Sequence, residues 1–271
     1  MIEIRKHGNV LKTDENGYLI SDASLEKIIP PWDMAVSFIK DAYIKHLGQQ
    51  LHSVYIRGSV ARGLAVEGLS DLDSLAFLHG FPPQERENLD WANQVSKQYL
   101  ERFPFSDRPE MQIKWIGPLL DNLEDKGISL KLEYVCVHGK DIIPQIPPVK
   151  IKALVKNSAF GSDYISRIVQ QVHDKVEGDV EAEQITSKCR WICKRFLRAG
   201  LSLVMSRANV FTRDLYYCYE LFSKFYPQQE PAMLKALQLA LNPTDNVNEL
   251  IPFIDEFGEF LALEADAIFG L

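Results

Sequence analysis

The sequence lacks several features that mark particular protein classes. No apolar run approaches the roughly 18 to 20 residues needed to cross a bilayer, and no charged segment followed by an apolar one opens the chain. Only four of the 271 residues are cysteine. These four, Cys136, Cys189, Cys193 and Cys218, do not form paired zinc knuckles, since Cys189 and Cys193 lie one helical turn apart. We expect reduced core thiols and a cytoplasmic protein without membrane segments.

The chain also lacks an excess of positive charge. Its formal net charge is −7, whereas binding to duplex nucleic acid depends on clustered lysine and arginine. We therefore expect no stable nucleic-acid partner. An acidic protein is better suited to a small or cationic partner. The sequence specifies no oligomeric state.

Hydrophobic residues make up 46% of the chain, which is enough for one large or two small domains. Proline-rich residues 139–160 divide a segment with strand patterns from one with helical patterns only. We expect an α+β protein, with a mixed-sheet domain over residues 1–150 and a helical bundle over residues 151–271. Residues 1–22 contain two short alternating runs around a turn, which predicts an N-terminal β addition.

Residues 54–59 carry the first chemical signal. The apolar run Val54-Tyr55-Ile56 predicts the end of a buried strand, and Gly58 permits a tight exit that brings backbone amides close to an anion. Ser59 suits a helix N-cap, where its hydroxyl and the free N–H groups of the first turn attract negative charge. The pattern predicts a phosphate site.

The second signal follows eleven residues later. Ser70 precedes Asp71-Leu72-Asp73, and an apolar strand pattern continues to Leu78. Side chains two residues apart on a strand point to the same face, so the two carboxylates converge. Such a pair repels unless a divalent cation joins it, and Mg²⁺ prefers oxygen ligands and phosphates. Taken alone, each motif is also common in turns.

Residues 129–138, bounded by Gly127 and Gly139, are rich in apolar residues, which predicts a third core strand. Glu133 is the only acid in it. A single acid in such a strand is often solvent-exposed at a sheet edge. On the same sheet as Asp71 and Asp73, however, it would either share a metal or act as the general base.

Other periodic patterns complete the expected elements. Before the third core strand we expect helices over 32–49, 84–103 and 119–126, and an extended segment over 111–116. In the second domain we expect helices over 163–177, 183–207, 212–226, 231–241 and 247–269.

Charge is segregated in the second domain. Residues 188–213 contain seven lysines and arginines and no acid, whereas residues 245–266 contain acids and no lysine or arginine. A phosphate partner would explain the first stretch and a cationic substrate the second. The alternative for each is an ordinary solvated helix face.

The combination of Gly58-Ser59, Ser70-Asp71-Leu72-Asp73 and Leu132-Glu133 followed by Ile143-Pro144 resembles the nucleotidyltransferase superfamily, which has the DNA polymerase beta-like fold. Within it, the pattern is most similar to the bacterial aminoglycoside adenylyltransferases of the streptomycin and spectinomycin type. The resemblance is specific over residues 54–78 and loose elsewhere.

This resemblance implies transfer of a nucleoside monophosphate, with ATP as the expected donor, to a hydroxyl of a small acceptor such as an aminoglycoside. Two Mg²⁺ ions would be held by Asp71, Asp73 and Glu133, with Glu133 favoured as the base. Gly58, Ser59 and Ser70 would position the nucleotide. In this family, two basic residues of the helical domain reach the nucleotide phosphates. One directly precedes an aspartate that opens a helix, and here Arg213 matches it. The other is an arginine, and here either Arg195 or Arg198 matches it.

Two other functions stay open at this point. In the first, the same reaction uses a protein side chain or a nucleic-acid end as the acceptor. In the second, the chain is a non-catalytic nucleotide sensor or a toxin-antitoxin partner. Intact carboxylates at Asp71, Asp73 and Glu133 argue against the non-catalytic alternative.

Overall fold

The computed structural model describes residues 6–82, 90–158, 160–176, 178 and 180–270. The chain divides into two compact units, one of residues 13–149 and one of residues 150–271 together with the N-terminal residues up to Lys12. The expected border at 150/151 therefore lies one residue from the observed one. The assignment of residues 6–12 to the first domain is wrong, because they pack with the helical unit.

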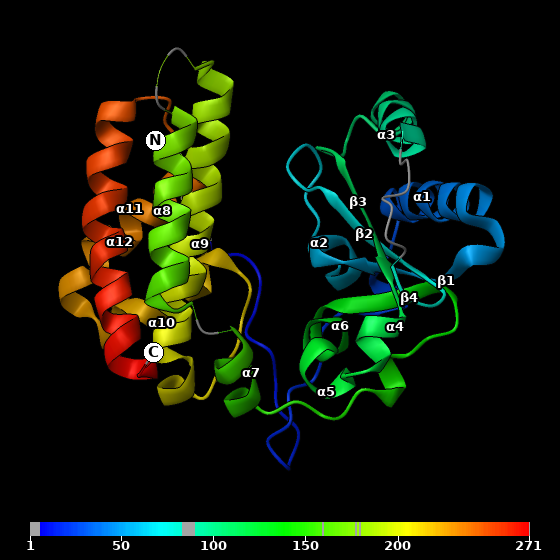
Figure 1. Ribbon diagram of the computed structural model, residues 1–271, viewed down its shortest axis with the longest axis horizontal. Helices are drawn as coiled ribbons and strands as arrows, with labels where there is room; N and C mark the ends of the chain where they lie inside the picture. The colour runs from blue at the N-terminus through cyan, green and yellow to red at the C-terminus, as the bar shows by residue number, and fades with distance from the viewer. Residues whose placement is uncertain (1–5, 83–89, 159, 177, 179, 271) are drawn as a thin grey trace. The chain divides into compact units, whose positions relative to one another are not determined.

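Unit 13–149 is built on a mixed four-stranded sheet with the order β3-β2-β1-β4 (Figure 1). Strand β1 pairs antiparallel with β2 and with β4, whereas β2 and β3 are parallel. The strands are β1 (Leu51–Arg57), β2 (Leu72–Leu78), β3 (Pro109–Trp115) and β4 (Tyr134–Gly139).

Helices cover both faces of this sheet. Those on one face are α1 (Trp32–Leu47), α2 (Gly58–Arg62) and α3 (Asp90–Arg102), and those on the other are α4 (Gly117–Leu120), α5 (Leu123–Lys126) and α6 (Ile128–Glu133). Alternation along β2 explains the division, because Ala76 packs toward the first group and Leu75 and Phe77 toward the second. Asp73 shares the face of Leu75, and this places it on the α4–α6 side.

The expected strand over residues 129–138 is wrong in its first half. Residues 128–133 form the short helix α6, and the strand begins at Tyr134. Ile128, Leu130 and Leu132 are all buried, and Leu130 packs in the same core cluster as Leu75 and Phe77 of β2. Alternating apolar residues alone do not distinguish this short helix from a strand.

The second unit is a bundle arranged around the 27-residue helix α9, which packs against all the others. Phe257 joins the bundle's centre, with its ring 5.7 Å from Phe196 and 6.3 Å from Phe222. The helices are α7 (Ile151–Ser158), α8 (Ser162–Val176), α9 (Ala182–Ala208), α10 (Leu215–Phe225), α11 (Glu230–Leu241) and α12 (Val247–Phe269). The expected bounds of α8 to α12 agree within three residues, whereas α7 occupies a segment expected to be a connection.

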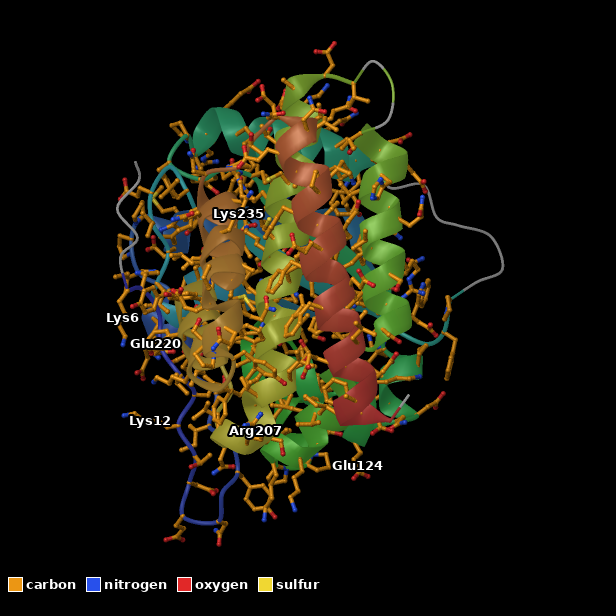
Figure 2. The ribbon with its side chains drawn as sticks, turned by 90° about the vertical axis from the view of Figure 1, so that its left-hand side faces the viewer. Lys6, Lys12, Glu124, Arg207, Glu220 and Lys235 are labelled. Atoms are coloured by element: carbon orange, nitrogen blue, oxygen red, sulfur yellow. The ribbon has the colours of Figure 1, made fainter. Side chains whose placement is uncertain are left out.

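Residues 6–12 are attached to the bundle by polar contacts. Lys6 pairs with Glu220 at 3.1 Å (Figure 2), and the Asn9 N–H donates to Asp214 Oδ2 at 2.7 Å. Leu11 donates its N–H to the Phe211 carbonyl. Where the β addition was expected, residues 13–19 form a turn closed by a bridge between Thr13 and Leu19, and the Leu19 N–H donates to the Val149 carbonyl.

All four cysteines are free thiols, and three of them are buried. No described helix is both long enough and apolar enough to span a bilayer. Several acids of the acidic stretch over residues 245–266 have partners within the bundle. Asp255 pairs with His173 at 2.7 Å and Glu249 with Lys235 at 3.6 Å. These contacts explain part of that stretch without a cationic ligand.

Candidate active site

Three carboxylates meet where β2 and β3 begin. Asp71 immediately precedes β2, Asp73 lies within it, and Glu110 is paired with Asp73 across the parallel ladder. One oxygen from each lies within 4.8 Å of the others. We call these three residues the carboxylate cluster. They are all half-buried, so a small ligand can reach them.

Gly58 makes room for the cluster. Its φ of +76° lies in the left-handed region, and a Cβ at this position would lie 2.9 Å from Asp73 Oδ2. Only glycine combines this backbone conformation with so close an approach. Gly58 therefore places the backbone at the start of α2 directly against a cluster carboxylate.

Arg57 lies against the carboxylate cluster as a cation. Its Nη2 lies 3.4 Å from Asp73 Oδ1 and 3.9 Å from Glu110 Oε1. The guanidinium also lies over the Tyr134 ring, 5.7 Å from its centroid. Burial disfavours its charge, but Asp73, Tyr134 and nearby acids outweigh burial and raise the pKa of Arg57 above its ordinary value.

The acids of the cluster differ in proton affinity. Burial raises the pKa of Asp73 to about 7, with repulsion from Asp71 adding to the effect and Arg57 opposing it. Burial acts in the same direction on Glu110, yet hydrogen bonds with Asp73 and Gln112 and the charge of Arg57 hold the pKa of Glu110 below its ordinary value. Asp73 is therefore about half protonated at neutral pH, whereas Glu110 more readily carries the negative charge.

Three oxygen donors this close together fit a small divalent cation. Mg²⁺ takes carboxylate and phosphate oxygens, and a cation would stabilise the charge of Asp73, which burial and then repulsion from Asp71 disfavour. Asp71 and Asp73 thus lie where the sequence analysis expected a metal site. Glu110 is the third acid of the cluster in place of Glu133.

Glu133 is the last residue of α6, not a residue within a strand. It accepts a hydrogen bond from Ser129 Oγ at 3.1 Å. Its charge also contributes to the raised pKa of Arg57, which places it in the electrostatic neighbourhood of the cluster. The expectation that Glu133 lies on the sheet beside Asp71 and Asp73 is wrong because the sheet begins one residue later.

The two serines have local structural roles. Arg57, in extended conformation, is the N-cap of α2, so Ser59 is the second residue of the helix and not its cap. Ser70 Oγ accepts the Val66 N–H at 2.9 Å and closes the loop before Asp71. That loop fixes the start of β2.

The three candidate arginines all belong to the helical unit. Arg195 donates to the Tyr164 hydroxyl and lies over the Trp191 ring, 5.1 Å from its centroid. Burial raises the pKa of the Cys218 thiol to about 12, and the charges of Arg198 and Arg213 oppose this shift, so both lie near that thiol. Arg195 is thus engaged by aromatic neighbours, and the other two surround a buried cysteine.

Sequence reasoning missed Arg57 and Glu110. Arg57 directly precedes Gly58, and Glu110 directly precedes the segment expected to be extended. Glu110 therefore has the same position before its expected strand as Asp71 has before β2. This shared position is the signal in the sequence that could have identified Glu110 as a further acid of the site.

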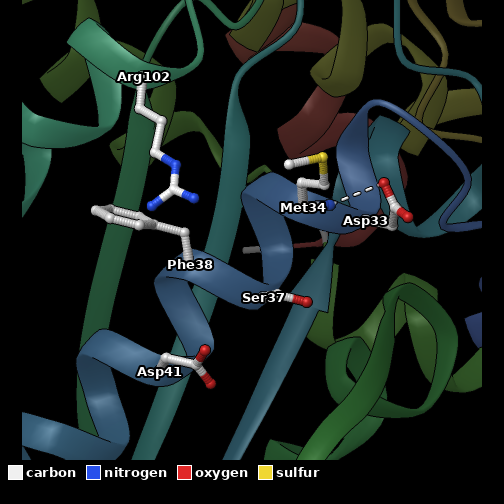
Figure 3. Close-up of a pocket in the computed structure, with 6 residues that line it drawn as sticks. All are labelled: Asp33, Met34, Ser37, Phe38, Asp41 and Arg102. Atoms are coloured by element: carbon white, nitrogen blue, oxygen red, sulfur yellow. Dashed lines mark hydrogen bonds between the residues drawn. The ribbon is translucent and has the colours of Figure 1, made fainter.

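A separate hollow of about 440 Å³ lies between α1 and α3. Asp33, Met34 and Asp41 line it, and Arg102 extends over the Phe38 ring (Figure 3). It contains no member of the carboxylate cluster. This hollow is on the α1–α3 side of the sheet, opposite the face of Asp73, and is not part of the candidate site.

Comparison with known proteins finds similar solved structures but no matching sequence. No protein-family model matches it, and no curated protein sequence matches it. Among solved structures, it is similar to the spectinomycin adenyltransferase AAD(9) from Enterococcus faecialis, solved with ATP and spectinomycin. The two are 13% identical with a TM-score of 0.48 over 84% of this chain and 98% of that chain. A similarity this low carries no argument, so the functional proposal depends on the chain's own residues.

Proposed function

We propose that this chain is a divalent-metal-dependent nucleotidyltransferase, which transfers a nucleoside monophosphate, with ATP as the favoured donor, to a hydroxyl of a small molecule. The observation that carries the proposal is the carboxylate cluster, with one oxygen from each of three acids within 4.8 Å. Gly58, in a left-handed conformation against Asp73, adds a backbone approach that a phosphate group requires.

The cluster acids would hold Mg²⁺, with room for a second ion once phosphates supply further ligands. When bound, the metal supplies charge neutralisation at the attacking and leaving oxygens. Asp71, Asp73 and Glu110 would also position the phosphates through the metal, with the backbone of Gly58 next to Asp73 on one side. Positioning of this kind is the main contribution a protein makes to phosphoryl transfer.

Arg57 would stabilise the negative charge of the phosphates. Its planar guanidinium has several donors and makes a charge-assisted pair with Asp73 and Glu110. Once a cation takes over those carboxylates, the guanidinium can donate to phosphate oxygens instead. Ser59 and Ser70 would support the same region, and Arg195, Arg198 and Arg213 are candidates for further phosphate contacts from the helical unit.

Glu133 is the proposed general base. It accepts from Ser129 and is outside the carboxylate cluster, so it can take a proton from the acceptor hydroxyl while the cluster holds metal. The three cluster acids would bind the metal and Glu133 would accept the proton, so each acid would have one role.

Two measurements test this function. Purified protein with Mg²⁺, each of the four nucleoside triphosphates and a library of hydroxyl compounds should release pyrophosphate, with label from the α-phosphate found on the acceptor. Independently of turnover, calorimetry should detect Mn²⁺ binding that Asp73→Asn weakens at least tenfold. Absence of pyrophosphate release with every donor and acceptor class would reject the proposal, and absence of Mn²⁺ binding would reject the metal site.

A further inference from the structure

A second cavity lies on the same face of the sheet as the carboxylate cluster. It measures about 600 Å³, within the range of small-molecule sites. Its floor includes Leu75 and Phe77 of β2, and its opposite wall includes Leu130 of α6. We call it the aromatic pocket, because Trp115 and Tyr134 also line it.

Three links join this pocket to the proposed catalytic residues. Leu75 follows Asp73 by two residues on one strand face, a separation of roughly 7 Å. Tyr134 lies under the Arg57 guanidinium. Ser129 lines the pocket and hydrogen-bonds Glu133, the proposed base. A molecule held in the pocket therefore lies next to both the metal site and the base.

The described lining residues of the pocket carry positive charge. Two lysines line it, Lys114 and Lys126, and its described lining residues include no aspartate or glutamate. Lys126 Nζ donates to the Pro118 carbonyl at 3.0 Å, which holds its charge at the rim. A polycationic molecule would lose its hydration against apolar walls and be repelled by both lysines. An anionic group would be attracted.

We propose that the aromatic pocket binds the acceptor, and that the acceptor is a hydroxyl-bearing molecule with an apolar aromatic body and an anionic group. This inference depends on the proposed function and names the substrate class of that same site. It differs from the cationic acceptor that the acidic stretch of the sequence suggested. In the reaction, the acceptor oxygen forms a bond to the α-phosphorus as the bond to the leaving oxygen breaks. Pyrophosphate departs with that electron pair, and the hydroxyl proton passes to Glu133.

Probe binding tests the pocket without turnover. The fluorescent anion 8-anilinonaphthalene-1-sulfonate should bind, and the Lys114→Glu/Lys126→Glu double variant should weaken it on the order of tenfold. The neutral analogue N-phenyl-1-naphthylamine should bind both proteins equally. Lys97→Glu is the matched control, since Lys97 is an exposed lysine on α3. Ser129→Trp, checked by thermal melting, should obstruct the pocket and weaken both probes.

Turnover tests the acceptor class. Pyrophosphate release with ATP and Mg²⁺ should be faster with hydroxyaryl carboxylates than with neutral aryl alcohols or with spectinomycin, and the double lysine variant should raise KM for the carboxylates about tenfold. Preferred use of spectinomycin, or probe affinity unaffected by the lysines, would overturn the inference. Lysine-dependent probe binding without pyrophosphate release from any class would instead reject the proposed function, and the acceptor role with it, and leave only the pocket's preference for anions.

Discussion

At the scale of single residues, the site concentrates negative charge that the folded chain stabilises only in part. Asp71, Asp73 and Glu110 are held together by strand pairing, and Arg57 is the cation placed against two of them. Active sites commonly show such perturbed proton affinities. Each member of this group should therefore affect stability, metal affinity and turnover in a different proportion.

Removing one cluster charge should abolish metal binding and turnover together. We expect Asp71→Asn and Glu110→Gln each to weaken Mn²⁺ binding at least tenfold by calorimetry, because each removes a ligand charge. Pyrophosphate release should fall by about a thousandfold. Turnover within tenfold of the parent in either variant would contradict the assignment of that residue to the metal site.

Glu133→Gln should separate the base from the cluster. A general base typically contributes roughly 10²- to 10⁴-fold to rate, so turnover should fall by that factor while Mn²⁺ and ATP affinities stay within about threefold. The two affinities are measured by calorimetry and the rate by pyrophosphate release. A collapse of Mn²⁺ affinity would make Glu133 a metal ligand instead.

The raised pKa of Asp73 predicts a pH-dependent stability. The folded protein releases this proton at a pH of about 7, whereas the unfolded chain releases it at roughly 3.9. The folded state therefore binds more protons between these values, and its stability decreases as pH rises through them. Without divalent metal, Asp73→Asn should be more stable than the parent by up to about 4 kcal/mol at pH 8, and the difference should largely disappear near pH 4. Urea denaturation at both pH values measures it, and a destabilised variant at pH 8 would contradict the raised pKa.

At the scale of elements, small residues decide how closely the helices of the bundle approach. Gly258 of α12 faces α8 and α9, where an added Cβ would lie 2.8 Å from Val169 Cγ2 and 3.3 Å from Phe196 Cζ. Valine is stiff at χ1 and cannot easily move away. The gain in helix propensity from glycine to alanine, about 1 kcal/mol, is thus opposed by overpacking.

We expect Gly258→Ala to destabilise the protein by about 1 to 2 kcal/mol in urea denaturation. Adding Val169→Ala should recover part of that loss, because the clash then has no partner. The double-mutant cycle isolates the contact. A Gly258→Ala variant more stable than the parent would show that helix propensity outweighs packing here.

At the scale of the whole molecule, the N-terminal segment of residues 6–12 belongs to the same unit as the C-terminal half of the chain. Gly8 has a φ of +93° and lies so close to Asp214 that a Cβ would overlap its carboxylate group. Asp214 also accepts the Asn9 N–H. The N-terminal segment of residues 6–12 is thus held by the loop before α10, although about 200 residues separate them in sequence.

Gly8→Ala should release residues 6–12 from the bundle. Hydrogen exchange at Asn9 and Leu11 should accelerate at least tenfold, because both N–H groups lose their acceptors. Gly17→Ala is the matched control, since its φ of +77° gives the same backbone strain with nothing within 4 Å of the added Cβ. Equal exchange in the two variants would mean that strain alone, and not packing against Asp214, determines the effect.

The sequence by itself determined the features that depend on neighbours along the chain. The α8–α12 helices follow from apolar spacing, and the pairing of Asp71 with Asp73 follows from the two-residue repeat of a strand. The expected α+β class is confirmed for the same reason. Where a short segment alternated, as in residues 128–133, spacing alone did not distinguish helix from strand.

Tertiary structure decided which strands are neighbours. Glu110 joins the cluster because β3 pairs with β2 in parallel register, and Arg57 reaches Asp73 because β1 pairs with β2 on the other side. Neither strand pairing can be predicted from the local spacing of apolar residues, because the register depends on how the whole sheet packs against its helices. The charge of the aromatic pocket and the attachment of residues 6–12 to the bundle are likewise products of long-range packing.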